Sequence, residues 1–264
     1  MKPFLARPGP YLVAHRGGAL LAPENTVAAF DRAAGLGADV IELDVRLAAD
    51  GTVVVFHDET TDRITGAPGT VEGRTLAELA ALDAGHSFTA DGGTTFPWRG
   101  RGLTVPTLAE VLDRHPGMLF NVEAKSPAPA LAEALAEVLR ARGRVDRVCV
   151  GSADDAQGER LRGLLPSACH FLPSRAATCH VLAAHMGGDV HGCPEGYDVA
   201  ELPLRTEEGL QVVDEATVRW FHRRGMPVHV WTVDEEADMR MLLDLGVDGI
   251  MSDRPDRLRR VLGR

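Results

Sequence analysis

Two short apolar runs of the sequence each end in a histidine, and a third run between them carries two acids. The histidines are His15 and His57, and the acids are Glu42 and Asp44. Because Glu42 and Asp44 are two residues apart, their side chains share one face if the run is a strand. Paired carboxylates suit a hard divalent cation, and histidines beside them suit general acid and base roles. The pattern therefore predicts metal-assisted acid–base chemistry.

A later segment repeats the alternation of polar and apolar residues. Asn121, Glu123 and Lys125 fall on one face of a possible strand, and Lys125 is the only lysine besides Lys2. We expect Glu123 to supply a third carboxylate and Lys125 to be a point charge for an anion at the rim. Arg16, beside a glycine in a loop, is also well placed for a phosphate.

The elements that must position these residues alternate between strand-length apolar runs and longer segments of helical period. The expected strands are 11–14, 40–45, 53–56, 118–123, 147–150, 168–172, 197–201, 228–231 and 249–251. The expected helices are 26–36, 76–82, 108–114, 130–142, 155–164, 215–224, 235–245 and 255–262, with Asn25 and Asp234 as caps of the first and seventh.

About eight such alternations over 264 residues are typical of a TIM (β/α)₈ barrel. The turn after the first strand, 15–18, is not the glycine fingerprint of a dinucleotide-binding doubly wound sheet. In a barrel, residues at the carboxyl ends of strands form the active site, so the histidines and acids are expected to converge there.

We expect residues 1–264 to form one domain. Residues 59–106, rich in Gly and Thr, interrupt the β–α rhythm and are expected to be an insertion on the top face of the barrel. With too few residues for a core of their own, they are interpreted as a lid or substrate wall that could use Phe88, Phe96 and Trp98.

Composition excludes several classes of partner. A formal charge of −10 and a pI of about 5.5 argue against nucleic acid and against a basic membrane-surface helix. The first residues contain no secretory h-region, and the chain has no apolar run of about 18 residues, so we expect no stable membrane association and a cytoplasmic location.

The cysteines have no C-x-x-C spacing, and free thiols are expected. A structural zinc site among seven Cys and His residues is the less favoured alternative, because their spacing gives few suitable pairs. These residues are Cys169, His170, Cys179, His180, His185, His191 and Cys193.

The motifs together resemble the glycerophosphodiester phosphodiesterase family. The resemblance rests on His15-Arg16-Gly17, Pro23-Glu24-Asn25-Thr26, Gly37–Val45, Asp50-Gly51-Thr52, Val54–Asp58, Asn121–Lys125 and Val230–Val233, and it covers nearly the whole chain in order. It implies a TIM barrel that uses a divalent cation, Mg²⁺ or Ca²⁺, to hydrolyse small glycerophosphodiesters to an alcohol and sn-glycerol 3-phosphate.

The resemblance also implies roles for individual residues. His15 and His57 would be the acid–base pair, and Glu42, Asp44 and Glu123 the metal ligands. Arg16 and Lys125 would hold the phosphate, and Trp231 would line the substrate pocket. The sequence departs from the usual family pattern at Asp234, often Asn, and at Ser252-Asp253, which replaces a common Thr-Asp pair.

Two other functions stay open at this point. A lysophospholipase D or sphingomyelinase D on the same barrel would need a broad apolar groove. A non-catalytic barrel that binds polyol phosphates would have no need of two histidines. Sequence leaves undecided the head group, the metal, which histidine is the acid, whether water or glycerol's own hydroxyl attacks, and the oligomeric state.

Overall fold

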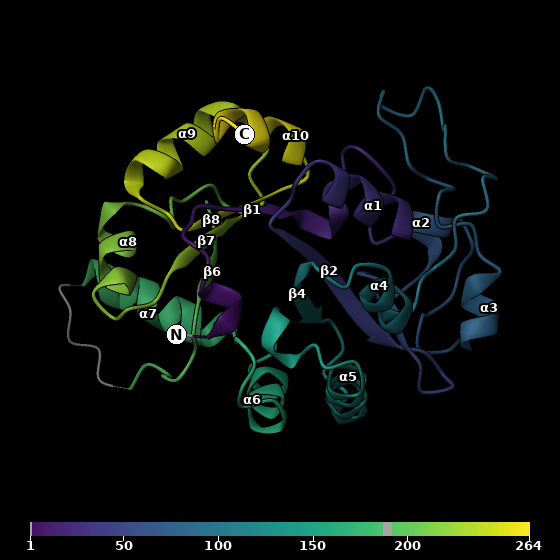
Figure 1. The fold of residues 1–264 in the computed structure, drawn as a ribbon, viewed down its shortest axis with the longest axis horizontal. Helices are drawn as coiled ribbons and strands as arrows, with labels where there is room; N and C mark the ends of the chain where they lie inside the picture. The colour runs from purple at the N-terminus through teal and green to yellow at the C-terminus, as the bar shows by residue number, and fades with distance from the viewer. Residues whose placement is uncertain (1, 187–191) are drawn as a thin grey trace.

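A curled sheet of mostly parallel strands forms the centre of the molecule, with helices around its outside (Figure 1). This computed structural model describes residues 2–186 and 192–264. The sheet order is β5-β4-β2-β1-β8-β7-β6. These strands are β1 (Tyr11–Ala14), β2 (Val40–Leu47), β4 (Leu119–Ala124), β5 (Val148–Gly151), β6 (Ala200–Pro203), β7 (Val228–Trp231) and β8 (Gly249–Ser252).

The segment 168–172 closes the gap between β5 and β6. Isolated parallel bridges join Cys149 to Cys169 and Phe171 to Val199. The Val150 amide donates to the Cys169 carbonyl, and the Leu172 amide donates to the Val199 carbonyl. This segment was expected as a full strand, but it is held only by these bridges. With it, the ring is the α/β barrel that the sequence predicted.

The strand that precedes His57 is not one of the parallel strands of this barrel. β3 (Val53–Val55) pairs antiparallel with the end of β2, so that Val45 lies opposite Val55. His57 therefore reaches the barrel mouth from a hairpin, although the sequence analysis expected it at the carboxyl end of a barrel strand. The Phe56 amide donates to the Asp44 carbonyl and fixes the approach of His57 to β2.

All eight expected helices are present, and their ends lie within two residues of the expected ones. They are α1 (Val27–Gly35), α3 (Leu76–Ala80), α4 (Leu108–Arg114), α5 (Pro129–Ala141), α6 (Asp155–Leu164), α8 (Glu215–His222), α9 (Glu236–Leu245) and α10 (Pro255–Val261). The sequence reading missed α2 (Asp62–Thr65) and α7 (Ser174–His185). None of the helices in the described ranges has the length and hydropathy needed to cross a membrane.

Strand alternation divides the core into two parts. The larger cluster fills the space between the sheet and the helices, as where Leu131, Leu135 and Leu139 of α5 are fully buried. A smaller cluster, including Tyr11, Val40 and Met251, fills the barrel interior. Two residues after Val13, Val40 and Met251 come His15, Glu42 and Asp253, so the interior changes from apolar at its base to ionisable at its mouth.

Residues 59–106 pack beside the β2–β3 hairpin. Val71, Leu79 and Val105 form a small core with Ala48, Val54 and Phe56 of the hairpin region. The stretch therefore shares its core with the barrel residues it follows.

The free-thiol prediction was wrong for two of the cysteines. Cys179 of α7 and Cys193 form a disulfide, while Cys149 and Cys169 are free and buried. The disulfide also removes two of the possible zinc ligands. A third, His170, directs both ring nitrogens at backbone carbonyls, and His191 lies outside the described residues.

Candidate active site

The turn after β1 brings the first histidine and an arginine to the barrel mouth. His15 begins a short 3₁₀ turn in which Arg16 has a φ of 50°, a left-handed conformation that is uncommon for a residue with a side chain. This conformation directs the Arg16 amide to Glu42 Oε2, at 2.8 Å. The next position, Gly17, needs a glycine, because a Cβ there would lie 2.8 Å from the Cβ of Ala29.

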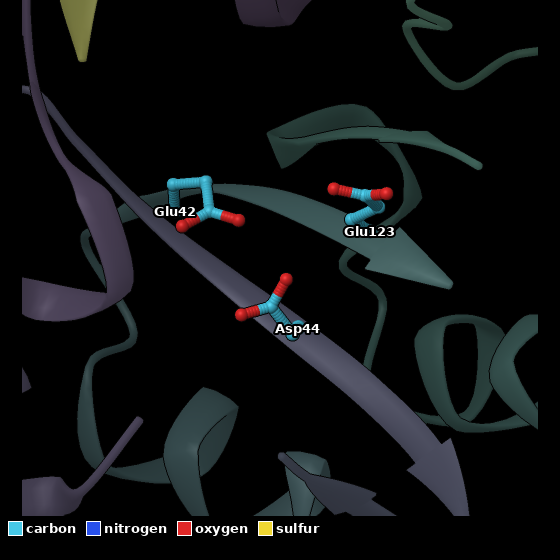
Figure 2. A group of neighbouring side chains, drawn as sticks. All are labelled: Glu42, Asp44 and Glu123. Atoms are coloured by element: carbon cyan, nitrogen blue, oxygen red, sulfur yellow. The ribbon is translucent and has the colours of Figure 1, made fainter. Parts of the chain in front are cut away.

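Three carboxylates converge from β2 and β4. In the parallel register Asp44 lies opposite Glu123, and Glu42 lies one alternation below on the same face. One oxygen of each of Glu42, Asp44 and Glu123 lies within 4.8 Å of the others. Figure 2 shows the three side chains pointing toward one another. Glu42 and Asp44 are 5% and 1% exposed, so they are not a solvent-facing pair. Arg46, the next residue on this face of β2, donates to the His57 carbonyl.

Two cationic side chains contact these acids. Lys125 Nζ lies 2.8 Å from Glu123 Oε2 and 3.3 Å from Asp44 Oδ1. Arg16 Nε lies 3.4 Å from Asp44 Oδ2 on the other side. Asn25, also in a left-handed conformation, donates to Asp44 Oδ2 over 2.8 Å. Asn25 is thus not the cap of α1, which is Thr26.

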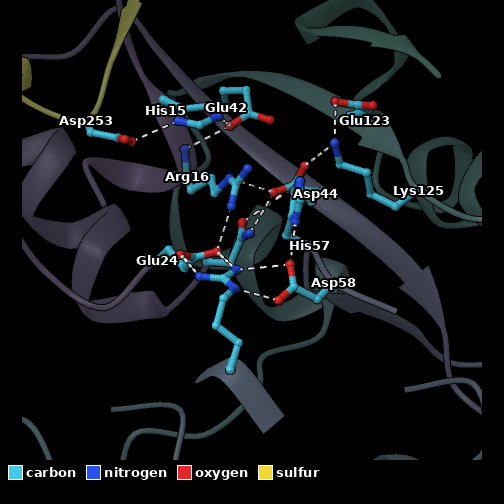
Figure 3. Close-up of polar contacts among 12 residues, drawn as sticks. His15, Arg16, Glu24, Glu42, Asp44, His57, Asp58, Glu123, Lys125 and Asp253 are labelled. Carbon is cyan, nitrogen blue, oxygen red and sulfur yellow. Dashed lines mark hydrogen bonds and ion pairs between the residues drawn. The ribbon is translucent and has the colours of Figure 1, made fainter. Parts of the chain in front are cut away.

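A carboxylate orients each histidine through Nδ1. His15 Nδ1 donates to Asp253, after β8, over 2.8 Å, and His57 Nδ1 donates to Asp58 over 2.6 Å (Figure 3). Asp253 is in turn held by its amide, which donates to Asp234 Oδ1. Asp234 therefore supports the site, although we had expected it to cap α9. In both histidines Nε2 is left free of this orienting bond.

One arginine of α2 connects the two halves of the mouth. Arg63 donates to both oxygens of Asp58, at 2.5 and 3.0 Å, and to both oxygens of Glu24, each at 2.8 Å. Glu24 Oε1 also accepts from Arg16 over 2.8 Å. These contacts join the second histidine to the turn after β1 through the chain His57–Asp58–Arg63–Glu24–Arg16. Figure 3 labels all of these residues except Arg63.

The surroundings shift the pKa values of the two histidines in opposite directions. Burial opposes the charged form of His15, but Glu42 and Asp253 outweigh it and raise the pKa of His15 to about 9. Burial lowers the pKa of His57, and the nearby Arg16 and Lys125 act in the same direction. At neutral pH His15 is therefore charged and His57 neutral, which is a suitable state for an acid and a base.

The pKa values of the two buried acids of β2 are also shifted in opposite directions. Burial, followed by the charge of Asp44, raises the pKa of Glu42 to about 8. Asp44 is equally buried, but Lys125 and Arg16 lower its pKa. An additional positive charge beside Glu42 would therefore favour its ionised form.

The remaining walls enclose a pocket of about 380 Å³. Besides polar residues they include six apolar side chains: Ala153, Phe171, Leu172, Ala177, Trp231 and Met251. Trp231 is 42% exposed at the end of β7 and is therefore not barrel core. None of the described residues that line this pocket comes from 59–106. Phe88 lies at a separate depression beside Arg63, so the aromatic wall expected from Phe88, Phe96 and Trp98 is not formed here.

The structure thus places seven of the eight candidate residues in one pocket: His15, His57, Arg16, Lys125, Trp231, Glu42 and Glu123. The eighth, Asp44, is in contact with Arg16 and Lys125 directly beneath. The sequence reading did not identify Glu24, Arg63 or Asp253 as parts of the site. For Asp253 the signal was available, because the residues that follow β8 share the mouth with those that follow β1.

Comparisons with known proteins agree with one another. Residues 15–257 match the Glycerophosphoryl diester phosphodiesterase family. The chain is 35% identical to a glycerophosphodiester phosphodiesterase of Caldanaerobacter subterraneus, over 94% of this chain and 95% of that protein. It resembles the glycerophosphoryl diester phosphodiesterase domain of an uncharacterised Mycobacterium tuberculosis protein, with a TM-score of 0.85, 25% identity and coverage of 97% and 99%. It also resembles an Oleispira antarctica phosphodiesterase solved with its product sn-glycerol-3-phosphate, with a TM-score of 0.76, 25% identity and coverage of 96% of each chain.

Proposed function

The chain belongs to the glycerophosphoryl diester phosphodiesterase family, and from that premise we propose that it hydrolyses small glycerophosphodiesters to an alcohol and sn-glycerol 3-phosphate. The proposal rests on one observation: two histidines, whose pKa values are shifted in opposite directions, lie beside three converging carboxylates at one pocket. A barrel that only bound polyol phosphates would have no use for an acid and a base.

We propose that Glu42, Asp44 and Glu123 hold one divalent cation, Mg²⁺ or Ca²⁺. One oxygen of each lies within 4.8 Å of the others, and carboxylate oxygen is the ligand type that both ions prefer. The Lys125 ammonium already bridges Asp44 and Glu123, which supports a strong attraction for positive charge at this place. When bound, a cation would offset the charge of the phosphodiester and stabilise the charge that develops in the transition state.

We assign the base to His57 and the acid to His15. Neutral His57 takes a proton through Nε2 from the attacking hydroxyl, whose oxygen forms the new bond to phosphorus. Charged His15 gives its Nε2 proton to the leaving alkoxide as the second P–O bond breaks. Asp58 and Asp253, each bonded to Nδ1, keep the opposite nitrogen directed at the reacting group.

The phosphate itself is held by Arg16 and Lys125, and Trp231 lines the path of the leaving alcohol. Arg16 and Lys125 come from opposite sides of Asp44 and both line the pocket, so an anion between them would contact two positive charges. A lysophospholipid or sphingomyelin substrate would need a broad apolar groove, and the aromatic residues of 59–106 do not line this pocket.

Turnover tests the proposal directly. Purified protein with Mg²⁺ or Ca²⁺ is incubated with glycerophosphocholine, glycerophosphoethanolamine and lysophosphatidylcholine, with and without chelator, and released sn-glycerol 3-phosphate and choline are measured. We expect chelator-sensitive release of sn-glycerol 3-phosphate from the first two substrates. Preference for the lysolipid would overturn the substrate assignment, and no release from any glycerophosphodiester would overturn the function.

A further inference from the structure

The floor of the pocket contains a polar pair that the proposed chemistry does not use. Glu201 of β6 reaches across the barrel to Asn121 of β4, whose Nδ2 donates to Glu201 Oε1 over 2.7 Å. β4 and β6 are not neighbours in the sheet, so this bond spans the interior. Both residues line the same pocket as His15 and His57.

Each member of the pair has unused hydrogen-bonding capacity. Asn121 is 2% exposed, and its buried Oδ1 has no hydrogen-bond partner among the described residues. The Glu201 side chain is 7% exposed, and within the described ranges all of its contacts go to Oε1. The nearest base, His229, has Nδ1 at 3.8 Å from that oxygen, beyond hydrogen-bond distance. A carboxylate so enclosed gains from a further donor at Oε2.

Strand register sets the depth of this pair below the groups that bind phosphate. Glu42 lies opposite Asn121 and Asp44 opposite Glu123, so Asn121 is one alternation deeper than Glu123. On the other wall Glu201 lies opposite His229 and Pro203 opposite Trp231, so Trp231 is one alternation above Glu201. The floor therefore presents a hydrogen-bond acceptor, whereas the exposed aromatic face lies at the mouth.

We propose that Glu201 is a specificity residue that accepts hydrogen bonds from the hydroxyls of the glycerol arm of the substrate. The inference rests on the proposed function, because the phosphate must first be held at the mouth by Arg16 and Lys125. A phosphodiester has two arms. One of them extends to the floor, where vicinal hydroxyls find a carboxylate acceptor, and the other leaves past Trp231. A quaternary ammonium head group suits the aromatic surface at the mouth better than the floor.

Binding of two matched ligands tests this assignment. sn-Glycerol 3-phosphate and propyl phosphate have the same carbon count and the same phosphate, but only the first has the diol. We expect the metal-loaded wild type to bind sn-glycerol 3-phosphate about 10-fold more tightly or better in calorimetry. Glu201→Gln should weaken that ligand about 10-fold and change propyl phosphate by less than about 2-fold, because only the charge-assisted bonds to the diol are lost.

The variant is nearly isosteric, and the Asn121 amide can turn so that its unpaired Oδ1 accepts from the new amide. Glu133→Gln, at an exposed position of α5, is the matched control and should affect neither ligand. Equal binding of the two ligands by the wild type would refute the inference whether or not the variant folds.

Turnover separates the diol from the head group. With glycerophosphocholine and glycerophosphoglycerol, Glu201→Gln should lower kcat/KM about 10- to 100-fold for both. A loss confined to glycerophosphocholine would mean that Glu201 recognises the cationic alcohol, and the diol assignment would be wrong. If the wild type hydrolyses neither substrate, the proposed function fails, while the ligand comparison still decides the role of Glu201.

Discussion

Binding of the proposed cation should release a proton from Glu42. Glu42 lies two residues from Asp44 on one face of β2 and is buried, so its pKa is raised to about 8. A cation needs the ionised carboxylate, and a proton therefore competes with it below that pKa. The apparent affinity for the cation should therefore fall as pH decreases through 8 and level off above it.

The size of the effect follows from the same pKa. With a pKa of about 8, roughly 1% of Glu42 is ionised at pH 6, about 9% at pH 7 and half at pH 8. The apparent association constant should rise about 50-fold from pH 6 to pH 8 and only about 2-fold from pH 8 to pH 9. If Glu42 kept its ordinary value of 4.5, the change from pH 6 to pH 8 would be a few per cent.

Calorimetry with Ca²⁺ across this range measures both affinity and proton release. Titrations at pH 7 in buffers of different ionisation enthalpy should give about 0.9 proton released per cation. Glu42→Gln removes this titration, so any steepness that remains in the variant belongs to other groups such as His15. Flat affinity between pH 6 and pH 8, with no proton released, would refute the reasoning that burial and Asp44 hold Glu42 protonated.

Three further predictions concern the groups around this centre. His57→Ala and His15→Ala should each lower kcat about 10²- to 10⁴-fold while calorimetric Ca²⁺ binding persists, and near-wild-type rates would contradict the acid–base assignment. Arg63→Ala should lower kcat about 10-fold with little change in KM, because Asp58 loses its bidentate partner and no longer fixes His57. In an Asp58→Ala background the same change should have almost no effect, and full additivity in that double-mutant cycle would show that Arg63 does not act through Asp58. Cys179→Ser should lower the free energy of unfolding in urea by about 3 kcal/mol, since the disulfide closes a 14-residue separation, whereas with reductant present the variant and wild type should unfold alike.

Much of the fold follows from local pattern. Strands at 11–14 and 228–231 and helices at 108–114 and 155–164 have the bounds that apolar periodicity predicted. α7 was missed because its sequence is only weakly amphipathic. The disulfide could not be found from spacing, since pairing depends on where the chain after α7 returns. The expected cytoplasmic location stays a prediction, and it no longer has free thiols at all four cysteines to support it.

The metal-ligand candidates were predictable, whereas most of the partners that orient the histidines were not, and the reason is geometric. Glu42, Asp44 and Glu123 share faces of two neighbouring strands, so alternation alone brings them together. Glu24 and Arg63 reach the same mouth from a turn and a short helix, and nothing in their local spacing relates them to the histidines. Asp253 could be placed at the mouth by its position after β8, but its pairing with His15 depends on the packing of β8 beside β1.

These partners have a common effect. Asp58 accepts a hydrogen bond from Nδ1 of His57, and Asp253 accepts one from Nδ1 of His15. Arg63 and Glu24 link Asp58 to Arg16. The bond from Asp253 does not involve the acids of the cation site, so it would continue to favour a charged His15 when those acids bind a cation. We therefore expect the stretch after β3 to contribute to catalysis through one arginine, Arg63, which holds Asp58 beside His57. The aromatic wall that its composition suggested does not line the pocket.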